Sequence, residues 1–427
     1  MEATTTLIER KDFITGFFLV IFYVLGFYGL QFFLYNMGMD VKIPTDKNLY
    51  AWDVGFYQSI AYGGYVFKDS GCNSGFFFLF PLLWHILHLG IWGVCIMNVL
   101  LFATGFSLLT SFLKLGIQDK LVWLTVPAFY FVFIPYSEAL FFFLAVLCII
   151  GIEQHRMPLV WVSIFLLSLT RATTLFMIPA FLIMQLVGNE RKLWRKAFIS
   201  YLCNYLVPSI IGFATFVIVQ FVATGVWFAY FKQQSIFWER KFTEPVFPLS
   251  GYDGSDRLIW LNALALFICF VSLVLVIRLI ILWALKGKTA NKSYLLSLVY
   301  LSIILYIIIF YNPKWGTNTT LVIGAIRYAL VNPFFYIFLY YNTIKIQYTW
   351  VHFTIVFLVS SLFWMVFGSY KHIDYQLFFT ADTVIIFFYM FYANRKLTWP
   401  AIIISAINIF FQVMLFQQFI KGQFPDG

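Results

Sequence analysis

The residues best suited to chemistry lie in a polar stretch that follows the first apolar segment. In LYAWDVGFYQSIAYGGYVFKDSGC, residues 49–72, Asp53 follows Trp52, and tyrosines and paired glycines come next. A carboxylate within hydrogen-bond reach of a hydroxyl can act as a general base, and neighbouring aromatic side chains can raise its basicity by excluding water. Asp53 is therefore a candidate base, and Trp52 and Tyr57 could form an aromatic wall or a face on which a sugar stacks. The alternative is that Asp53 caps a helix over residues 54–62.

Three further charged residues interrupt apolar sequence. Glu138 follows Ser137, a residue typical of a helix N-cap, and a carboxylate in the first turn also suits the helix dipole. Arg171, in SLTRATTLFMIP, and Arg327, in GAIRYALVNP, could each grip a phosphate through two parallel hydrogen bonds. The alternative for both arginines is a side chain that extends to the lipid headgroups.

Two pairs of polar residues carry weaker signals. Lys371 and His372 could contact an anionic group, and the alternative is a solvated turn. His85 and His88 are spaced i, i+3 and could share a helix face, but two ligands do not make a metal site, so no metal is expected.

The sequence has no P-loop and no GxGxxG motif, which argues against a nucleotide-binding enzyme. No cofactor is expected.

The composition places all these residues in a membrane protein. The 427 residues are 62% hydrophobic and only 11% charged, whereas a soluble domain carries about 25% charged residues. A spanning helix needs roughly 20 apolar residues. On that scale the sequence predicts an all-α polytopic membrane protein, a single domain over 1–427, with about thirteen spans at 13–35, 90–113, 121–135, 138–152, 158–170, 174–188, 198–225, 258–284, 294–312, 320–341, 349–368, 377–392 and 399–420.

The basic residues predict how these spans are oriented. Lys and Arg dominate the short loops on the side of the N-terminus, as in RKLWRK at 191–196, which indicates that this side is cytoplasmic. The net charge of +10 is therefore no sign of nucleic-acid binding. The outer side receives the two longest loops, 36–75 and 226–257, and the candidate residues named above. Within residues 76–89, Pro81 interrupts the apolar run, which favours an interfacial helix on the outer face before the second span.

The loop motif resembles the PIG-V-type mannosyltransferases, multi-span enzymes of the GT-C glycosyltransferase superfamily. WDVGFYQSIAYGGY and GFFFLFPLL are similar to that family's first motif through Trp52, Asp53, Tyr57, Ile60, Ala61, Gly64, Tyr65, Phe76, Phe77, Leu79, Pro81, Leu82 and Leu83. Three later segments are similar through Tyr136, Ser137, Glu138, Arg171, Arg327, Tyr328 and Pro333. Phe78 stands where the family has a proline, and the Asn and Gly expected after Arg171 are missing.

The resemblance implies a GT-C-like helical bundle and a sugar transfer. Asp53 would be the base of an inverting displacement that moves a hexose, mannose by this resemblance, from a polyprenyl-phosphate donor to an acceptor hydroxyl. Trp52, Tyr57 and Tyr65 would shape the sugar site, and Glu138 would orient the acceptor or stabilise its helix. The leaving phosphate would be bound by Arg171, Arg327, Lys371 and His372.

The partners implied are the lipid-linked donor, a glycan, glycolipid or protein acceptor, and the lipid bilayer, without nucleic acid. A lipid-diphosphate glycan polymerase or ligase is an alternative, and so is a lipid-sugar flippase or transporter. A transporter usually places its charges near the membrane midplane, whereas the charges here gather toward one face. Richness in Phe, Ile, Tyr and Lys favours a bacterial inner membrane with a periplasmic site; the alternative is the endoplasmic reticulum with a luminal site.

Overall fold

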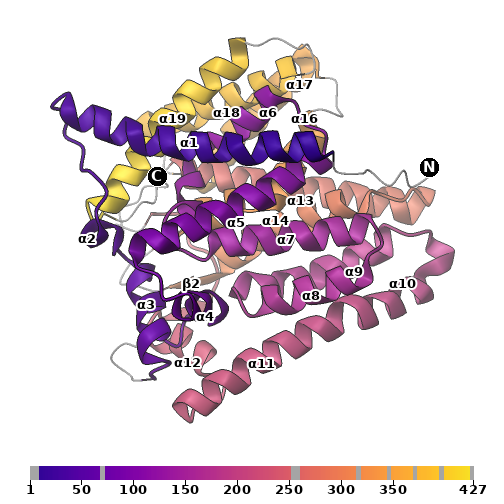
Figure 1. Cartoon of the computed structure of the whole chain (residues 1–427). Coiled ribbons are helices and arrows are strands. Elements are labelled where there is room, and N and C mark those ends of the chain that lie inside the picture. The colour runs from indigo at the N-terminus through magenta and orange to yellow at the C-terminus, as the bar shows by residue number, and fades with distance from the viewer. Residues whose placement is uncertain are drawn as a thin grey trace.

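A computed structural model describes residues 9–67, 73–251, 260–313, 319–343, 348–368, 373–393 and 399–423. Nearly all regular structure in these segments is helical (Figure 1). The α-helices are α1 (Arg10–Asn36), α2 (Asp46–Leu49), α3 (Asp53–Gly63), α4 (Leu79–Ile86), α5 (Ile91–Phe112), α6 (Ile117–Leu124), α7 (Glu138–Glu153), α8 (Met157–Ser168), α9 (Met177–Val187), α10 (Trp194–Tyr201), α11 (Val207–Thr224), α12 (Ala229–Ile236), α13 (Trp260–Lys286), α14 (Lys292–Phe310), α15 (Ala325–Leu330), α16 (Pro333–Thr343), α17 (Trp350–Phe367), α18 (Ile373–Ala393) and α19 (Trp399–Ile420). The shorter elements are the 3₁₀ helices η1 (Pro127–Val132), η2 (Ala172–Phe176) and η3 (Arg191–Leu193), the π-helical turn η4 (Leu202–Leu206), and the strands β1 (Arg240–Phe242) and β2 (Tyr311–Pro313).

Several of these helices are built to cross a bilayer. In the described parts of the chain, seven helical segments are long and apolar enough: Arg10–Asn36, Ile91–Phe112, Arg191–Thr224, Leu261–Lys286, Lys292–Phe310, Trp350–Phe367 and Trp399–Ile420. The protein is therefore an all-α, multi-pass integral membrane protein. The predicted number of about thirteen spans is not confirmed.

Two of the predicted spans are broken by proline. The segment predicted as a helix over 121–135 consists of α6 and η1, and Pro127 begins the second piece. The segment predicted over 320–341 consists of α15, which starts after Gly324 at φ 69°, and α16, which starts at Pro333. Proline has no amide hydrogen to donate and disfavours a helical residue before it. Apolar composition alone does not show such breaks.

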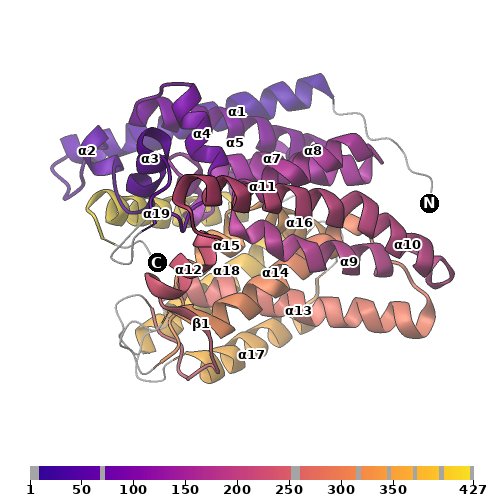
Figure 2. The same ribbon diagram turned by 90° about the horizontal axis from the view of Figure 1, so that it is seen from below.

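The long helices lie side by side around one apolar core (Figures 1 and 2). In the first half of the chain, α1 packs on α5, α5 on α7, and α7 on α8. In the second half, α13 packs on α14, and α14 also lies against α9 and α16. Both halves contribute to a single buried cluster, so the polar segments are left at the two ends of the bundle.

The two ends of the bundle differ in character. At one end gather α2, α3 and α12, which belong to the two long loops predicted to face outward, together with α4 and the β1–β2 pair (Figure 1). Helix α4 is separate from α5, as Pro81 led us to expect. The opposite end carries the basic turns, where Arg191 Nη1 donates to the carbonyl of Ala284 at 2.7 Å. The candidate residues must therefore be sought at the α3 end.

Candidate functional site

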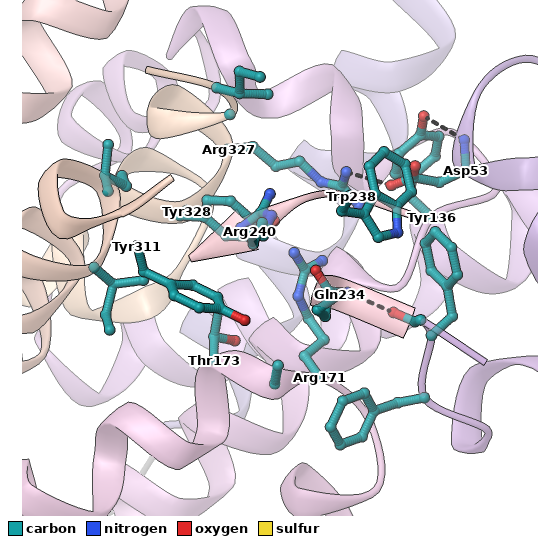
Figure 3. A pocket seen from close by; sticks show the side chains of 18 of the residues that line it. Asp53, Tyr136, Arg171, Thr173, Gln234, Trp238, Arg240, Tyr311, Arg327 and Tyr328 are labelled. Carbon is teal, nitrogen blue, oxygen red and sulfur yellow. Dashed lines mark hydrogen bonds and ion pairs between the residues drawn. The ribbon is translucent and has the colours of Figure 1, made fainter. Parts of the chain in front are cut away.

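At the α3 end, the polar loops enclose a pocket of about 490 Å³ (Figure 3). Its walls come from α3, the turn at Gly75, residues 170–173, the α12–β1 segment, the end of α14, and α15. One side is apolar and includes Ile304, Ile307 and Ile308. The rest is aromatic and charged, so the pocket can accommodate a molecule with both a polar and an apolar part.

Asp53 stands at the start of α3 and faces a guanidinium group. The N-cap residue of α3 is Trp52, at φ 55°, and no side chain caps the helix. Asp53 is thus not the N-cap residue, contrary to the capping alternative. Its Oδ2 accepts a hydrogen bond from Arg327 Nη1 at 2.5 Å, and its backbone amide donates to the Tyr136 hydroxyl at 3.3 Å. The carboxylate therefore faces the pocket and does not cap the helix.

Glu138, the first residue of α7, joins two arginines from distant parts of the chain. Its Oε1 pairs with Arg171 Nη1 at 2.6 Å and also accepts from Arg327 Nε. The side chain is 2% exposed, and Oε2 has no hydrogen-bond partner within the described segments. We call Asp53, Glu138, Arg171 and Arg327 the charged cluster. Within it, two carboxylates balance two guanidinium groups.

Burial explains why the two arginines of the charged cluster need these partners. The side chain of Arg171 is 10% exposed and that of Arg327 is 14% exposed. A guanidinium stays protonated in proteins, and a charge removed from water is costly unless it is paired. Neither side chain has the arrangement expected of an arginine that extends to lipid headgroups.

Hydroxyl groups and aromatic rings complete the surroundings of the charged cluster. Ser137 is at the N-cap position of α7 but does not cap it; its Oγ accepts from Arg171 Nη1 at 3.2 Å and lies 2.9 Å from the Tyr57 hydroxyl. Burial raises the pKa of Tyr57, so this hydroxyl stays protonated. The Arg327 guanidinium carbon lies 4.5 Å from the centre of the Tyr136 ring, a favourable cation–π contact.

The other predicted site residues lie in different places. Trp52 lines the pocket, and its indole Nε1 donates to the carbonyl of Gln423 at 3.2 Å. Tyr65 is not part of the lining, since its hydroxyl donates to the carbonyl of Phe76 at 2.8 Å within a neighbouring apolar cluster. Lys371 and His372 lie outside the described residues. Among the described residues, no three His, Cys, Asp or Glu side chains gather as metal ligands.

The second outer loop supplies residues to which the sequence assigned no role. Gln234, Trp238 and Arg240 all line the pocket, as do Tyr311 and Tyr328 (Figure 3). The sequence did place Arg240 among the outward charges. The signal that could have marked it is the run FWERKF, which puts aromatic and basic residues together in the longest outer loop after the first.

The arrangement has three chemical capacities. It can accept a proton at Asp53, bind an anion through guanidinium groups, and hold an apolar chain along the isoleucine side. Comparison with protein-family models, with curated proteins and with solved structures gives no significant match.

Proposed function

We propose that the protein is a membrane glycosyltransferase that moves a hexose, mannose by the motif resemblance, from a polyprenyl-phosphate donor to an acceptor hydroxyl. One observation supports this most strongly. Asp53, Glu138, Arg171 and Arg327 belong to four separate motifs spread over more than half of the chain, and their side chains meet at a single pocket. Motifs that matched by chance would have no reason to converge in space.

The reaction would be a single displacement that inverts the anomeric carbon. The acceptor oxygen attacks that carbon, its proton passes to Asp53 Oδ2, and the bond between the anomeric carbon and the phosphate oxygen breaks. The lipid phosphate leaves with the bonding electrons. Arg327 Nη1 donates to Asp53 Oδ2 at 2.5 Å, so a shift of Arg327 toward the incoming phosphate would make this carboxylate a stronger base.

Glu138 would serve this reaction indirectly. Its carboxylate contacts Arg171 and Arg327 and is itself nearly inaccessible. It therefore acts as a positioning residue for the two cations that would stabilise the leaving phosphate, rather than as a contact of the acceptor. A negative charge behind both guanidinium groups also offsets their mutual repulsion.

The proposed topology follows from the two ends of the bundle. The basic turns near Arg191 would face the cytoplasm by the positive-inside rule. The pocket at the other end would then open to the periplasm of a bacterium, or to the lumen of the endoplasmic reticulum in a eukaryote. In this GT-C-like arrangement, α4 would lie at the outer interface and the prenyl chain along Ile304, Ile307 and Ile308.

The test is sugar transfer from labelled polyprenyl-phosphate mannose by the purified protein, with a membrane extract as acceptor source. We expect turnover by the wild type and a loss of at least about 100-fold in Asp53→Asn, since a general base contributes roughly 10²–10⁴-fold. Asp46→Asn, an exposed acid in the same loop, is the matched control and should remain active.

Two results would contradict the proposal. Full activity of folded Asp53→Asn would remove Asp53 from the mechanism. A folded wild type that releases no sugar would reject the monophosphate donor. Assays with diphosphate-linked glycans, and of lipid-sugar movement across liposomes, would then identify which alternative function holds.

A further inference from the structure

We infer that Arg240 of the second outer loop binds the phosphate of a lipid-linked ligand in the pocket. The inference that the ligand is a lipid rests on the proposed function, whereas the inference that Arg240 binds an anion does not. The charged cluster already satisfies Arg171 and Arg327 with carboxylates. Arg240 lines the same pocket without forming an ion pair with any described residue.

Among the residues that the structure describes, the surroundings of Arg240 contain aromatic groups and no acid paired with it. The residue is half-buried, and its Nε is fully buried with no hydrogen-bond partner among the residues the structure describes. Figure 3 shows its side chain between Tyr311 and Tyr328 on one side and Gln234 and Trp238 on the other. Burial raises the pKa of Tyr311 while the nearby Arg240 charge opposes this rise. Tyr311 therefore remains neutral and does not balance the guanidinium.

The missing partner must be an anion. A guanidinium cannot lose its proton in a protein, and a buried polar group without a partner is costly. The pocket region brings three guanidinium groups, of Arg171, Arg240 and Arg327, against the two carboxylates of the charged cluster. The planar fork of Arg240 suits a phosphate, which it can contact through two parallel hydrogen bonds.

Arg240 is held in place by contacts between the two outer loops. Strand β1 pairs with β2, so that Arg240 is opposite Pro313 and Phe242 is opposite Tyr311. Before β1, Gln234 Nε2 donates to the carbonyl of Gly75 at 3.4 Å. Gln220 Nε2 donates to the carbonyl of Ser74 at 2.7 Å and its Oε1 accepts from the amide of Tyr230 at 3.0 Å. The loop that carries Arg240 is thereby fixed to the loop that carries Asp53.

The apolar side of the pocket selects a lipid over a free phosphate. Tyr311 follows directly after α14, whose residues Ile304, Ile307 and Ile308 also line the pocket. A ligand with its phosphate at Arg240 can lay a hydrocarbon chain along these side chains. Inorganic phosphate would satisfy Arg240 but would leave this apolar surface in contact with water.

The test measures binding alone, with polyprenyl phosphate that carries no sugar, to the full chain purified in lipid nanodiscs. We expect Arg240→Gln to raise Kd at least tenfold, and Arg240→Lys, which retains the charge but not the fork, to give a smaller increase. Lys241→Gln is the matched control, because Lys241 is the exposed neighbour on the same strand. It should bind like the wild type, and neither millimolar inorganic phosphate nor phosphatidylglycerol should displace the ligand.

Each contrary outcome has a definite meaning. Unchanged affinity in folded Arg240→Gln, or no binding by the wild type, would overturn the inference. Displacement by inorganic phosphate or phosphatidylglycerol would overturn the choice of lipid ligand. If Arg240→Gln misfolds, the Kd of Arg240→Lys provides the test. A Kd equal to that of the wild type would also overturn the inference that Arg240 binds the phosphate. Binding through Arg240 without sugar transfer would reject the proposed function and leave this inference intact. Sugar transfer with an unchanged donor KM in Arg240→Gln would support the proposed function and overturn this inference.

Discussion

A single carboxylate oxygen of Glu138 forms ion pairs with two guanidinium groups, and the whole side chain is 2% exposed. At the scale of residues, this contact determines how the charged cluster is held. Arg171 and Arg327 lie close enough to repel one another, and only the acid between them makes that proximity favourable. The buried charges are therefore interdependent, and removing one affects the others.

We expect Glu138→Gln to destabilise the protein by about 3 kcal/mol, because breaking a buried ion pair leaves uncompensated charge. The measurement is unfolding of the purified protein followed by tryptophan fluorescence. Glu190→Gln is the control: Glu190 pairs with Lys192 on the exposed surface, where loss of an ion pair costs at most about 1 kcal/mol. Equal destabilisation by both substitutions would contradict the importance of burial.

Sequence reasoning selected the members of the charged cluster because acids and arginines are rare in apolar sequence. It did not predict their pairing. Glu138 was expected to contact the acceptor or its own helix, and only the meeting of α7, α15 and the residues before η2 shows that it bridges Arg171 and Arg327. Residue type indicates that a charge needs a partner, whereas the identity of the partner depends on three-dimensional packing.

At the scale of elements, the turn at Gly75 connects the two outer loops. A Cβ atom at this position would lie 3.2 Å from Trp238 Nε1 and 3.4 Å from Gln234 Nε2. The absence of a side chain therefore permits α12 to approach the first loop. This approach sets the position of β1 and, with it, that of Arg240.

We expect Gly75→Leu to raise the Kd for polyprenyl phosphate several-fold, because the new side chain would push the α12–β1 segment away from the pocket. The same binding assay provides the measurement. Gly63→Leu is the control, since a Cβ atom at Gly63 meets nothing within 4 Å. Wild-type affinity in Gly75→Leu would show that this close approach does not position the site.

The bounds of elements were predicted well where long apolar segments are continuous. The prediction of 13–35 falls within α1, and that of 399–420 coincides with α19. It was wrong around Pro127 and Pro333, where one apolar run contains two short helices. Counting apolar residues detects what can be buried, whereas backbone hydrogen bonding decides where a helix stops.

At the scale of the molecule, the composition sufficed to predict an all-α membrane protein but not the number of spans. Helices α8 and α9 pack against neighbouring helices but are shorter than an independent span. Hydropathy is equally high for a segment that faces lipid and for one that is buried in a protein core, so it does not distinguish the two. The uneven distribution of charge between the two ends is the more informative property, because it predicts an orientation.

We expect a membrane-impermeant thiol reagent to label Lys241→Cys in intact spheroplasts, and Lys288→Cys only after permeabilisation. Both residues are exposed; Lys241 is next to Arg240 on β1, and Lys288 lies beside Arg191 at the basic end. Cys72 and Cys203 are first changed to Ser, and this parent protein, which should stay unlabelled, is the control. The reverse pattern of labelling would contradict the proposed orientation.

The hydrogen bond between Arg327 and Asp53 has a consequence for the order in which two substrates would bind. The Arg327 guanidinium donates to Asp53 Oδ2 at 2.5 Å, and a carboxylate paired with a cation is a weaker base than an unpaired one. An acceptor hydroxyl that reached Asp53 while this ion pair is intact would therefore meet a weaker base. In the proposed reaction, the phosphate of the bound donor would attract Arg327 away from Asp53, and the carboxylate would then be free to take the proton of the acceptor. This coupling would give an ordered reaction in which the donor binds before the acceptor is deprotonated.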